Sequence, residues 1–117
     1  MAVAAQLNGP RYSYVSITAG PGAGGDWSDA VSMSKKNTDA LFFSRTGAGV
    51  GTVTIQFRLP HAGNAWVDYV TDESLATGER FRLDDKAAGV RWRAGIKEDS
   101  SADDTYTSGT IIVGFDW

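Results

Sequence analysis

The feature that most constrains the fold of this chain is a period-two alternation of side chains within residues 89–117. Two segments place apolar side chains at every second position: Val90, Trp92, Ala94 and Ile96 in the first, and Ile111, Val113, Phe115 and Trp117 in the second. Because successive side chains of a β-strand point to opposite faces of a sheet, each segment is predicted to be a strand with one face on a core. The polar residues 98–109 between them are predicted to form a loop. The alternation up to Trp117 predicts that this end is held in the sheet.

Weaker strand signals precede this region. Residues 12–18 and 52–59 also alternate, while 40–44 is a short apolar run typical of a strand buried on both faces. Further short candidates are residues 29–34, 65–70 and 79–83. Segments 52–59 and 65–70 are predicted to form a hairpin. With turn signals about every eight to twelve residues, the pattern predicts an all-β antiparallel β-sandwich or jelly roll of seven to eight strands.

The length of 117 residues predicts a single domain. Within it, residues 1–25 are expected to form an N-terminal arm (1–10), a strand and a glycine-rich loop (19–25), and residues 26–117 the β-sandwich. The glycine-rich loop lacks the Gly-Lys-Ser/Thr ending of a phosphate-binding loop, and no helical pattern follows it.

The composition excludes several classes of function. The chain has no cysteine, which excludes disulfides, thiolate metal sites and thiol nucleophiles. Its net charge of -3 and pI near 4.9 disfavour non-specific binding to nucleic acid. No apolar run reaches the ~20 residues of a membrane span, and residues 1–10 do not resemble a signal peptide. We expect a soluble protein made inside a cell, with neither nucleic acid nor a membrane as a partner.

The residues that could carry catalysis or bind a metal do not form a known motif. His61 is the only histidine and lies on a Pro/Gly turn. Four acidic residues of the 98–109 loop lack the spacing of a calcium loop: Glu98, Asp99, Asp103 and Asp104. Four further carboxylates could be paired for glycoside hydrolysis, although nothing in the sequence sets their separation: Asp68, Glu73, Glu79 and Asp84. The sequence therefore predicts no enzyme, no metal site and no cofactor.

The aromatic residues divide into two groups. Trp92 and Trp117 lie on the apolar sides of their segments and are expected in the core. Trp66 alternates with Asp68, and Trp27 follows the glycine-rich loop. These two tryptophans are the better candidates for exposed contacts, including stacking on a sugar, although packing within the protein is the larger expectation.

The basic residues suggest a binding surface. Arg80 and Arg82 alternate in one segment, and Arg91, Arg93 and Lys97 alternate in the next. A hairpin closed by residues 84–88 would make these five cations cross-strand neighbours, which repel unless acids intervene. Pairing with Glu79, Asp84 and Asp85 in solvent is one interpretation. The other is a face that docks on an acidic protein surface, where arginine makes bidentate contacts with carboxylates.

The second half of the chain resembles a known family. Four runs carry the resemblance: VTIQFRLPHAGNAWVDY at 53–69, GERFRL at 78–83, AGVRWRAGIK at 88–97 and YTSGTIIVGF at 106–115. Together they are similar to small β-sandwich virion proteins of tailed bacteriophages, over about residues 52–117. The resemblance implies a capsid decoration (cement) protein, or a tail accessory module. Such a protein would be made in the host cytoplasm and would bind the major capsid protein on the capsid exterior as a dimer or trimer.

Two functions therefore stand as hypotheses. The first is a virion structural protein that stabilises the head by bridging coat subunits. The alternative is a carbohydrate- or receptor-binding tail or fibre module that uses Trp66, Trp27 and acidic loop residues. The candidate interface residues are Arg80, Arg82, Arg91, Arg93, Lys97, Trp66 and Trp27.

Overall fold

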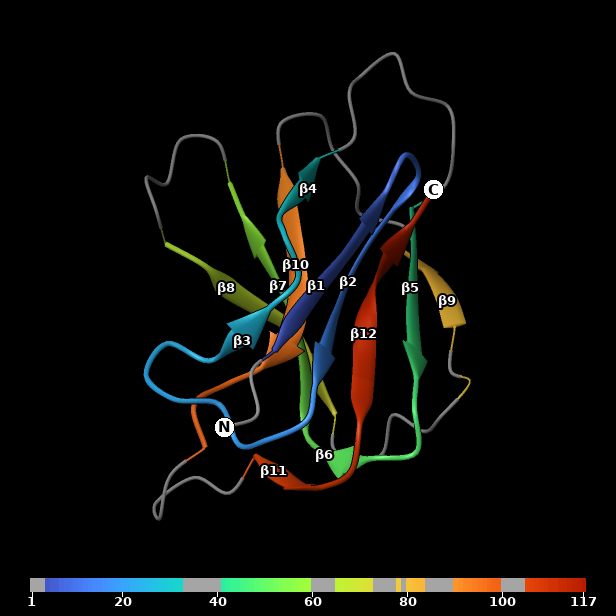
Figure 1. The fold of residues 1–117 in the computed structure, drawn as a ribbon. Coiled ribbons are helices and arrows are strands. Elements are labelled where there is room, and N and C mark those ends of the chain that lie inside the picture. Colours follow the sequence, from blue (N-terminus) through green and yellow to red (C-terminus); the bar gives the residue numbers. More distant parts are fainter. Residues whose placement is uncertain are drawn as a thin grey trace.

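The computed structural model describes residues 4–32, 41–59, 65–72, 78, 80–83, 90–99 and 105–117. These residues form an all-β sandwich of antiparallel sheets, which confirms the predicted fold class (Figure 1). The described residues contain twelve strands, of which eight have at least four residues and β3, β4, β6 and β11 have two or three. No helix occurs in these ranges, so they hold no helical segment able to cross a membrane.

The first sheet has five antiparallel strands in the order β1-β2-β12-β5-β9. Their bounds are β1 Ala5–Gly9, β2 Tyr12–Ile17, β12 Ile111–Asp116, β5 Leu41–Thr46 and β9 Arg80–Leu83. The C-terminal strand β12 lies at the centre of this sheet, where Val113 is aligned with Val15 of β2. The backbone N–H of Trp117 then donates to the carbonyl oxygen of Arg11 at 3.0 Å, so the end of β12 is fixed to the β1–β2 turn.

The second sheet has the order β3-β10-β7-β8, and β4 pairs with the same edge of β10 as β3. Its bounds are β3 Asp26–Trp27, β4 Val31–Ser32, β10 Arg91–Ile96, β7 Val53–Arg58 and β8 Val67–Asp72. The predicted hairpin of the 52–59 and 65–70 segments is confirmed by the pairing of β7 with β8. A third pair, β6 Val50–Gly51 with β11 Tyr106–Ser108, lies at the end of the sandwich (Figure 1).

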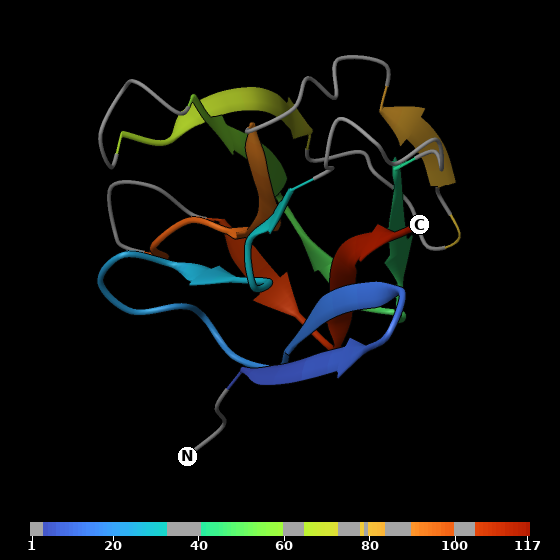
Figure 2. The same cartoon turned by 90° about the horizontal axis from the view of Figure 1, so that it is seen from above.

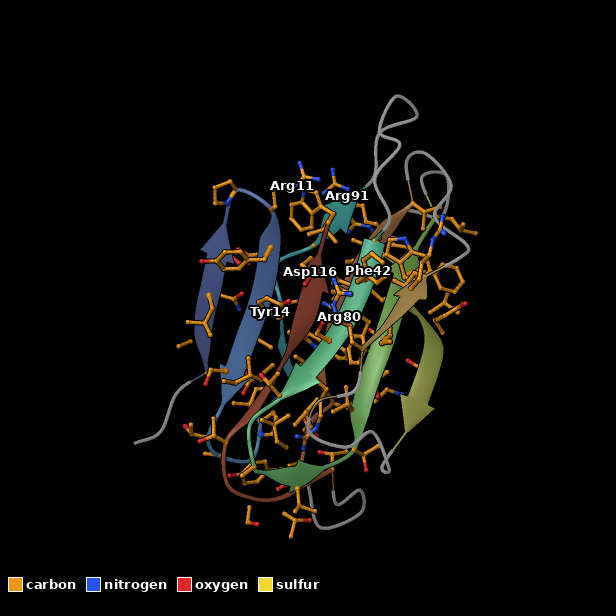
Figure 3. All side chains as sticks on the ribbon, turned by 90° about the vertical axis from the view of Figure 1, so that its right-hand side faces the viewer. Arg11, Tyr14, Phe42, Arg80, Arg91 and Asp116 are labelled. Atoms are coloured by element: carbon orange, nitrogen blue, oxygen red, sulfur yellow. The ribbon has the colours of Figure 1, made fainter. Side chains whose placement is uncertain are left out.

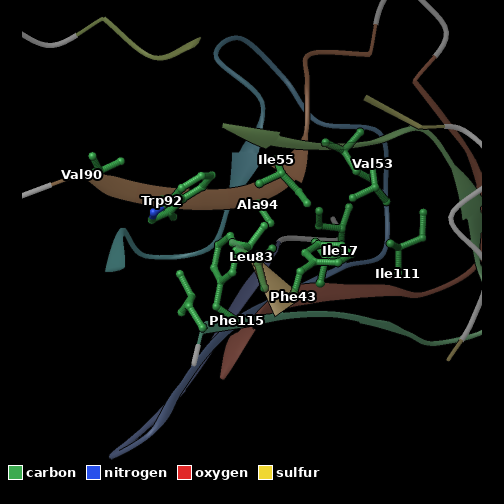
Figure 4. Close-up of a cluster of buried hydrophobic side chains, with 14 residues drawn as sticks. Ile17, Phe43, Val53, Ile55, Leu83, Val90, Trp92, Ala94, Ile111 and Phe115 are labelled. Carbon is green, nitrogen blue, oxygen red and sulfur yellow. The ribbon is translucent and has the colours of Figure 1, made fainter. Parts of the chain in front are cut away.

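The core lies between the two sheets and comes from the alternating strands (Figure 4). Among the described residues, fourteen apolar side chains are buried in it: Val15, Ile17, Leu41, Phe43, Val53, Ile55, Leu83, Val90, Trp92, Ala94, Ile96, Ile111, Val113 and Phe115. The alternation therefore predicted the inward faces of β10 and β12 correctly. Phe43 meets Phe115 edge to face at 6.1 Å, and Trp92 meets Phe57 at 5.8 Å, so each sheet also has an aromatic pair of its own.

Two expectations about loops and arms are wrong. Residues 5–9 belong to β1, an edge strand paired with β2, instead of an arm. They show no alternation because most of them are exposed on both faces of this edge. The 98–109 segment likewise contains β11, whose three polar residues pair with β6.

Viewed from above, β1 and β2 lie on the opposite side of the molecule from β7 and β8 (Figure 2).

Candidate functional site

The five predicted basic residues lie on different sheets. Arg80 and Arg82 are in β9, which pairs with β5 in the first sheet. Arg91 and Arg93 are in β10, which pairs with β7, β3 and β4 in the second sheet, and Lys97 follows it. β9 and β10 therefore do not pair with each other, and the five cations are not the cross-strand neighbours that a hairpin would have made them. Alternation places these side chains on outward faces, but it carries no information on which strand lies beside which.

The outward side of the second sheet gathers a different set of charged groups, which we call the basic face. It consists of Gln56, Arg58, Asp68, Arg91, Arg93 and Lys97, with Trp27 and Trp66 beside them. In the strand register Arg91 is opposite Arg58, and Arg93 is opposite Gln56. Gln56 is in turn opposite Asp68 of β8. Four cations thus share this face with one carboxylate of the described chain.

Arg93 is the centre of the basic face. Its guanidinium carbon lies 4.2 Å from the centre of the Trp27 ring and 4.3 Å from that of Trp66. The guanidinium of Arg58 also lies over the Trp66 ring, at 5.0 Å. Cations are attracted to the faces of indole rings, and arginine stacks on them with its planar group. Trp27 and Trp66, which the sequence suggested for exposed contacts, are therefore half-buried against Arg93.

A chain of hydrogen bonds fixes the orientation of Arg93. Its Nε–H donates to Oε1 of Gln56 at 2.9 Å, and Nε2 of Gln56 donates to Oδ1 of Asp68 at 2.9 Å. The other oxygen of Asp68 accepts from the ammonium group of Lys97. Asp68 thereby sets which way the Gln56 amide points, because only its NH₂ side can donate to a carboxylate.

Gly95 of β10 brings Trp27 to this face. A Cβ at Gly95 would lie 1.9 Å from the carbonyl oxygen of Asp26 and 2.8 Å from the Cα of Trp27. Only a residue without a side chain at this position lets the backbone of β3 approach its paired strand β10 so closely. The indole N–H of Trp27 then donates to the carbonyl oxygen of Gly24 at 2.6 Å, which holds the ring in place.

The pKa directions on the basic face follow from this packing. Burial lowers the pKa of the Arg93 guanidinium, and the positive charge of Arg58 acts in the same direction. Burial alone would raise the pKa of Asp68, but hydrogen bonds from Lys97 and Gln56 and the charge of Lys97 leave it below its ordinary value. Asp68 is therefore a carboxylate, and Arg93 a partly desolvated cation.

The outward side of the first sheet is different, and we call it the tyrosine face: Tyr12, Tyr14, Phe42, Arg80 and Asp116. Figure 3 shows Tyr14, Phe42, Arg80 and Asp116 close together on this side. Asp116 accepts from the Tyr14 hydroxyl at 3.0 Å and from Nη2 of Arg80 at 2.8 Å. Arg80 also stacks over the Phe42 ring at 4.0 Å. Burial raises the pKa of Tyr14, and its hydrogen bond to Asp116 acts in the same direction.

The remaining sequence candidates are distributed as follows. Trp92 is buried in the core as expected, and Trp117 is half-buried against it. Asp99 accepts the backbone N–H of Thr105 at 3.0 Å, so it supports the turn into β11. His61, Glu73, Glu79, Asp84, Asp85, Asp103 and Asp104 lie outside the described residues. Within the described ranges, no group of three or more His, Asp or Glu is placed to hold a metal ion.

Sequence reasoning missed Arg58 and Gln56 as parts of the basic face, and it missed the whole tyrosine face. Gln56 and Arg58 do alternate with the apolar residues of β7, which was the available signal. Asp68 was considered only as a catalytic carboxylate. The missing information was the pairing of β7 with both β10 and β8, which brings these three side chains together.

Comparison with known proteins shows no family for this chain. No family model matches this chain, and no curated protein matches it. A cupin domain from Bordetella pertussis Tohama I has a similar solved structure, with a TM-score of 0.38 and 12% sequence identity, over 98% of this chain and 91% of that chain. A similarity at this level gives no information on function.

Proposed function

We propose that this chain is a capsid decoration protein of a tailed bacteriophage, which binds the capsid exterior and bridges neighbouring subunits of the major capsid protein. The support is the resemblance of residues 52–117 to small β-sandwich virion proteins. The observation that carries a binding role is the basic face, where Arg91, Arg93 and Lys97 follow one outward side of β10 in a chain of net charge -3. Such a face complements an acidic protein surface.

The proposed mechanism is stabilisation by binding to the assembled state. A rigid sandwich that contacts two coat subunits binds the closed shell and not the separated subunits. Binding of this kind shifts the equilibrium toward the assembled state by mass action. A dimer or trimer of the decoration protein would add multivalency, which converts weak individual contacts into tight attachment.

Co-sedimentation with undecorated empty capsids tests this function. The Arg91→Glu variant reverses one exposed charge of the basic face, whereas Arg82→Glu makes the same change on β9 of the other sheet. We expect Arg91→Glu to weaken capsid binding about tenfold or more at low salt, with a smaller effect at high salt. Arg82→Glu should bind like the unmodified protein. Failure of the unmodified protein to bind capsids would contradict the proposal.

The alternative is a carbohydrate- or receptor-binding module. The observation that favours it is the exposed aromatic surface, where Tyr12 remains 41% exposed and stacks at 5.7 Å on Tyr14. Aromatic rings of this kind bind the apolar faces of sugars. A glycan array separates the two functions, because binding to a glycan without binding to capsids would favour the alternative.

A further inference from the structure

Arg93 differs from the other cations of the basic face because its position is fixed from three sides. Two indole rings contact its guanidinium, and Gln56 accepts from its Nε–H. Its terminal nitrogens have no hydrogen-bond partner among the described residues, and they are not buried. The four N–H groups of its terminal nitrogens are therefore not used by the described residues, on a side chain whose rotation these three contacts restrict.

This arrangement suits one kind of ligand. A guanidinium presents parallel N–H groups that match the two oxygens of a carboxylate, and a charge-assisted bidentate pair is among the stronger polar contacts in proteins. Fixing the side chain before binding lowers the entropy lost on binding. The rings that contact Arg93 also partly exclude water from it, which strengthens its interaction with an anion.

We propose that Arg93 is the anchoring residue of the basic face, and that it binds the side-chain carboxylate of an Asp or Glu in an acidic segment of the protein partner. Charge complementarity favours a protein carboxylate, because the exposed side chain of Arg91 lies on the same outward face of β10 as Arg93 and suits a segment with several acidic residues. Gln56 and Asp68 act as positioning residues for Arg93. This inference rests on the proposed docking function and adds the chemistry of the partner.

The test is an NMR titration that follows the side-chain Nε–H and terminal N–H signals of Arg93 in the full chain. The probe is a blocked tri-glutamate peptide, Ac-Glu-Glu-Glu-NH₂, compared with inorganic phosphate at equal ionic strength. We expect the peptide to shift the Arg93 signals in a saturable way and phosphate to shift them less. Arg93 signals that do not move with the peptide, or that respond more strongly to phosphate, would overturn the assignment.

Matched variants separate geometry from charge. Arg93→Lys keeps the charge but loses the planar fork, and we expect it to weaken peptide binding about tenfold, the loss of one or two charge-assisted hydrogen bonds. Arg82→Lys on β9 should leave peptide binding unchanged. Equal affinity of Arg93→Lys and the unmodified protein would overturn the proposal, and the wild-type titration decides the question even if the variant does not fold.

A capsid-binding assay with the same variants distinguishes the two proposals. Capsid binding that Arg93→Lys leaves unchanged would contradict the role of Arg93 and leave the decoration function standing. Peptide binding at Arg93 without any capsid binding would support the carboxylate site and reject the decoration function. Gln56→Leu, which removes the acceptor for Nε–H, should weaken peptide binding less than Arg93→Lys does. An equal or larger loss would contradict a purely positioning role of Gln56.

Discussion

The two outward faces of the sandwich use the same kinds of side chain in opposite ways. On the tyrosine face, the one carboxylate of Asp116 accepts from both Arg80 and Tyr14, and Arg80 also covers Phe42. The cation there is matched by an acid. On the basic face, Asp68 pairs with Lys97 while Arg93 is held by neutral groups, two indole rings and an amide.

The comparison shows that position alone does not make an arginine available to a partner. Arg80 and Arg93 both stack on aromatic rings, and both lie on outward positions of a sheet. Arg80 donates to a carboxylate of its own chain, whereas Arg93 donates one N–H to the neutral oxygen of Gln56 and pairs with no carboxylate of the described residues. A partner with carboxylates therefore gains more from Arg93 than from Arg80.

The largest expected effect is the loss of stability when a core residue is truncated, which tests whether both sheets unfold together with one core. Trp92 lies behind the basic face and Phe115 behind the tyrosine face, and both are buried. Trp92→Ala and Phe115→Ala should each lower the free energy of unfolding by about 3–5 kcal/mol, because each leaves a large cavity. Urea unfolding followed by far-UV circular dichroism should show one transition for both variants.

A control and a contrary result complete that experiment. Leu7→Ala, at a position 40% exposed on β1, should change the free energy of unfolding by no more than about 0.5 kcal/mol. Two separate transitions in either core variant would mean that the two sheets unfold independently. The basic face and the tyrosine face would then belong to two separate folding units.

The next effect in size uses two glycines, one in each sheet. A Cβ at Gly95 would meet the Asp26 carbonyl oxygen, and a Cβ at Gly114 would lie 2.1 Å from the carbonyl oxygen of Ser13. Gly95→Ala and Gly114→Ala should each cost about 1–3 kcal/mol of stability through overpacking. Only Gly95→Ala should also weaken binding to capsids, because it moves Trp27 away from Arg93.

Gly22→Ala is the matched control, since a Cβ at Gly22 would have no atom within 4 Å. It should leave both stability and binding unchanged. Unchanged capsid binding by Gly95→Ala, measured by the same co-sedimentation assay, would show that Trp27 does not position Arg93.

The smallest expected effect is on the pH dependence of stability, to which Asp68 on the basic face and Tyr14 on the tyrosine face contribute at opposite ends of the pH range. The folded-state pKa of Asp68 lies below its ordinary value of 3.8, so its contribution is present above that pH and is lost as the pH falls through the folded value. The pKa of Tyr14 lies above its ordinary value of 10.0, so its contribution is present below pH 10 and is lost as the pH rises through the folded value. Each contribution should be under about 1 kcal/mol, since both groups are partly solvated.

Two variants test these contributions to stability, each followed by the urea midpoint of unfolding across the acidic and alkaline pH ranges. Asp68→Asn should flatten the acidic limb and leave the alkaline limb unchanged, because Lys97 and Gln56 are the groups that face it. Tyr14→Phe should do the reverse, with Asp116 and Arg80 facing that residue. Identical pH profiles for both variants and the unmodified protein would show that neither face contributes through these groups.

The sequence by itself determined which side chains point inward. The alternation in residues 89–117 predicted the buried positions of β10 and β12, and the segments at 52–59 and 65–70 predicted the β7–β8 hairpin correctly. These predictions succeeded because alternation is a local property of an extended chain, set by residues two positions apart and by the need to bury apolar surface. The edge strand β1 escaped this reasoning because it buries neither of its faces.

Only the tertiary structure decided which outward side chains share a face. Arg80 and Arg82 lie in the first sheet, on the same outward side as Asp116. Arg91 and Arg93 lie in the second sheet, on the same outward side as Arg58, Gln56 and Asp68. The order of strands depends on pairings between segments far apart in the chain, such as β2 with β12, and nothing in a single segment's pattern encodes its neighbour. For that reason the sequence could name most of the cations but could not place Arg93 against two tryptophans and a glutamine.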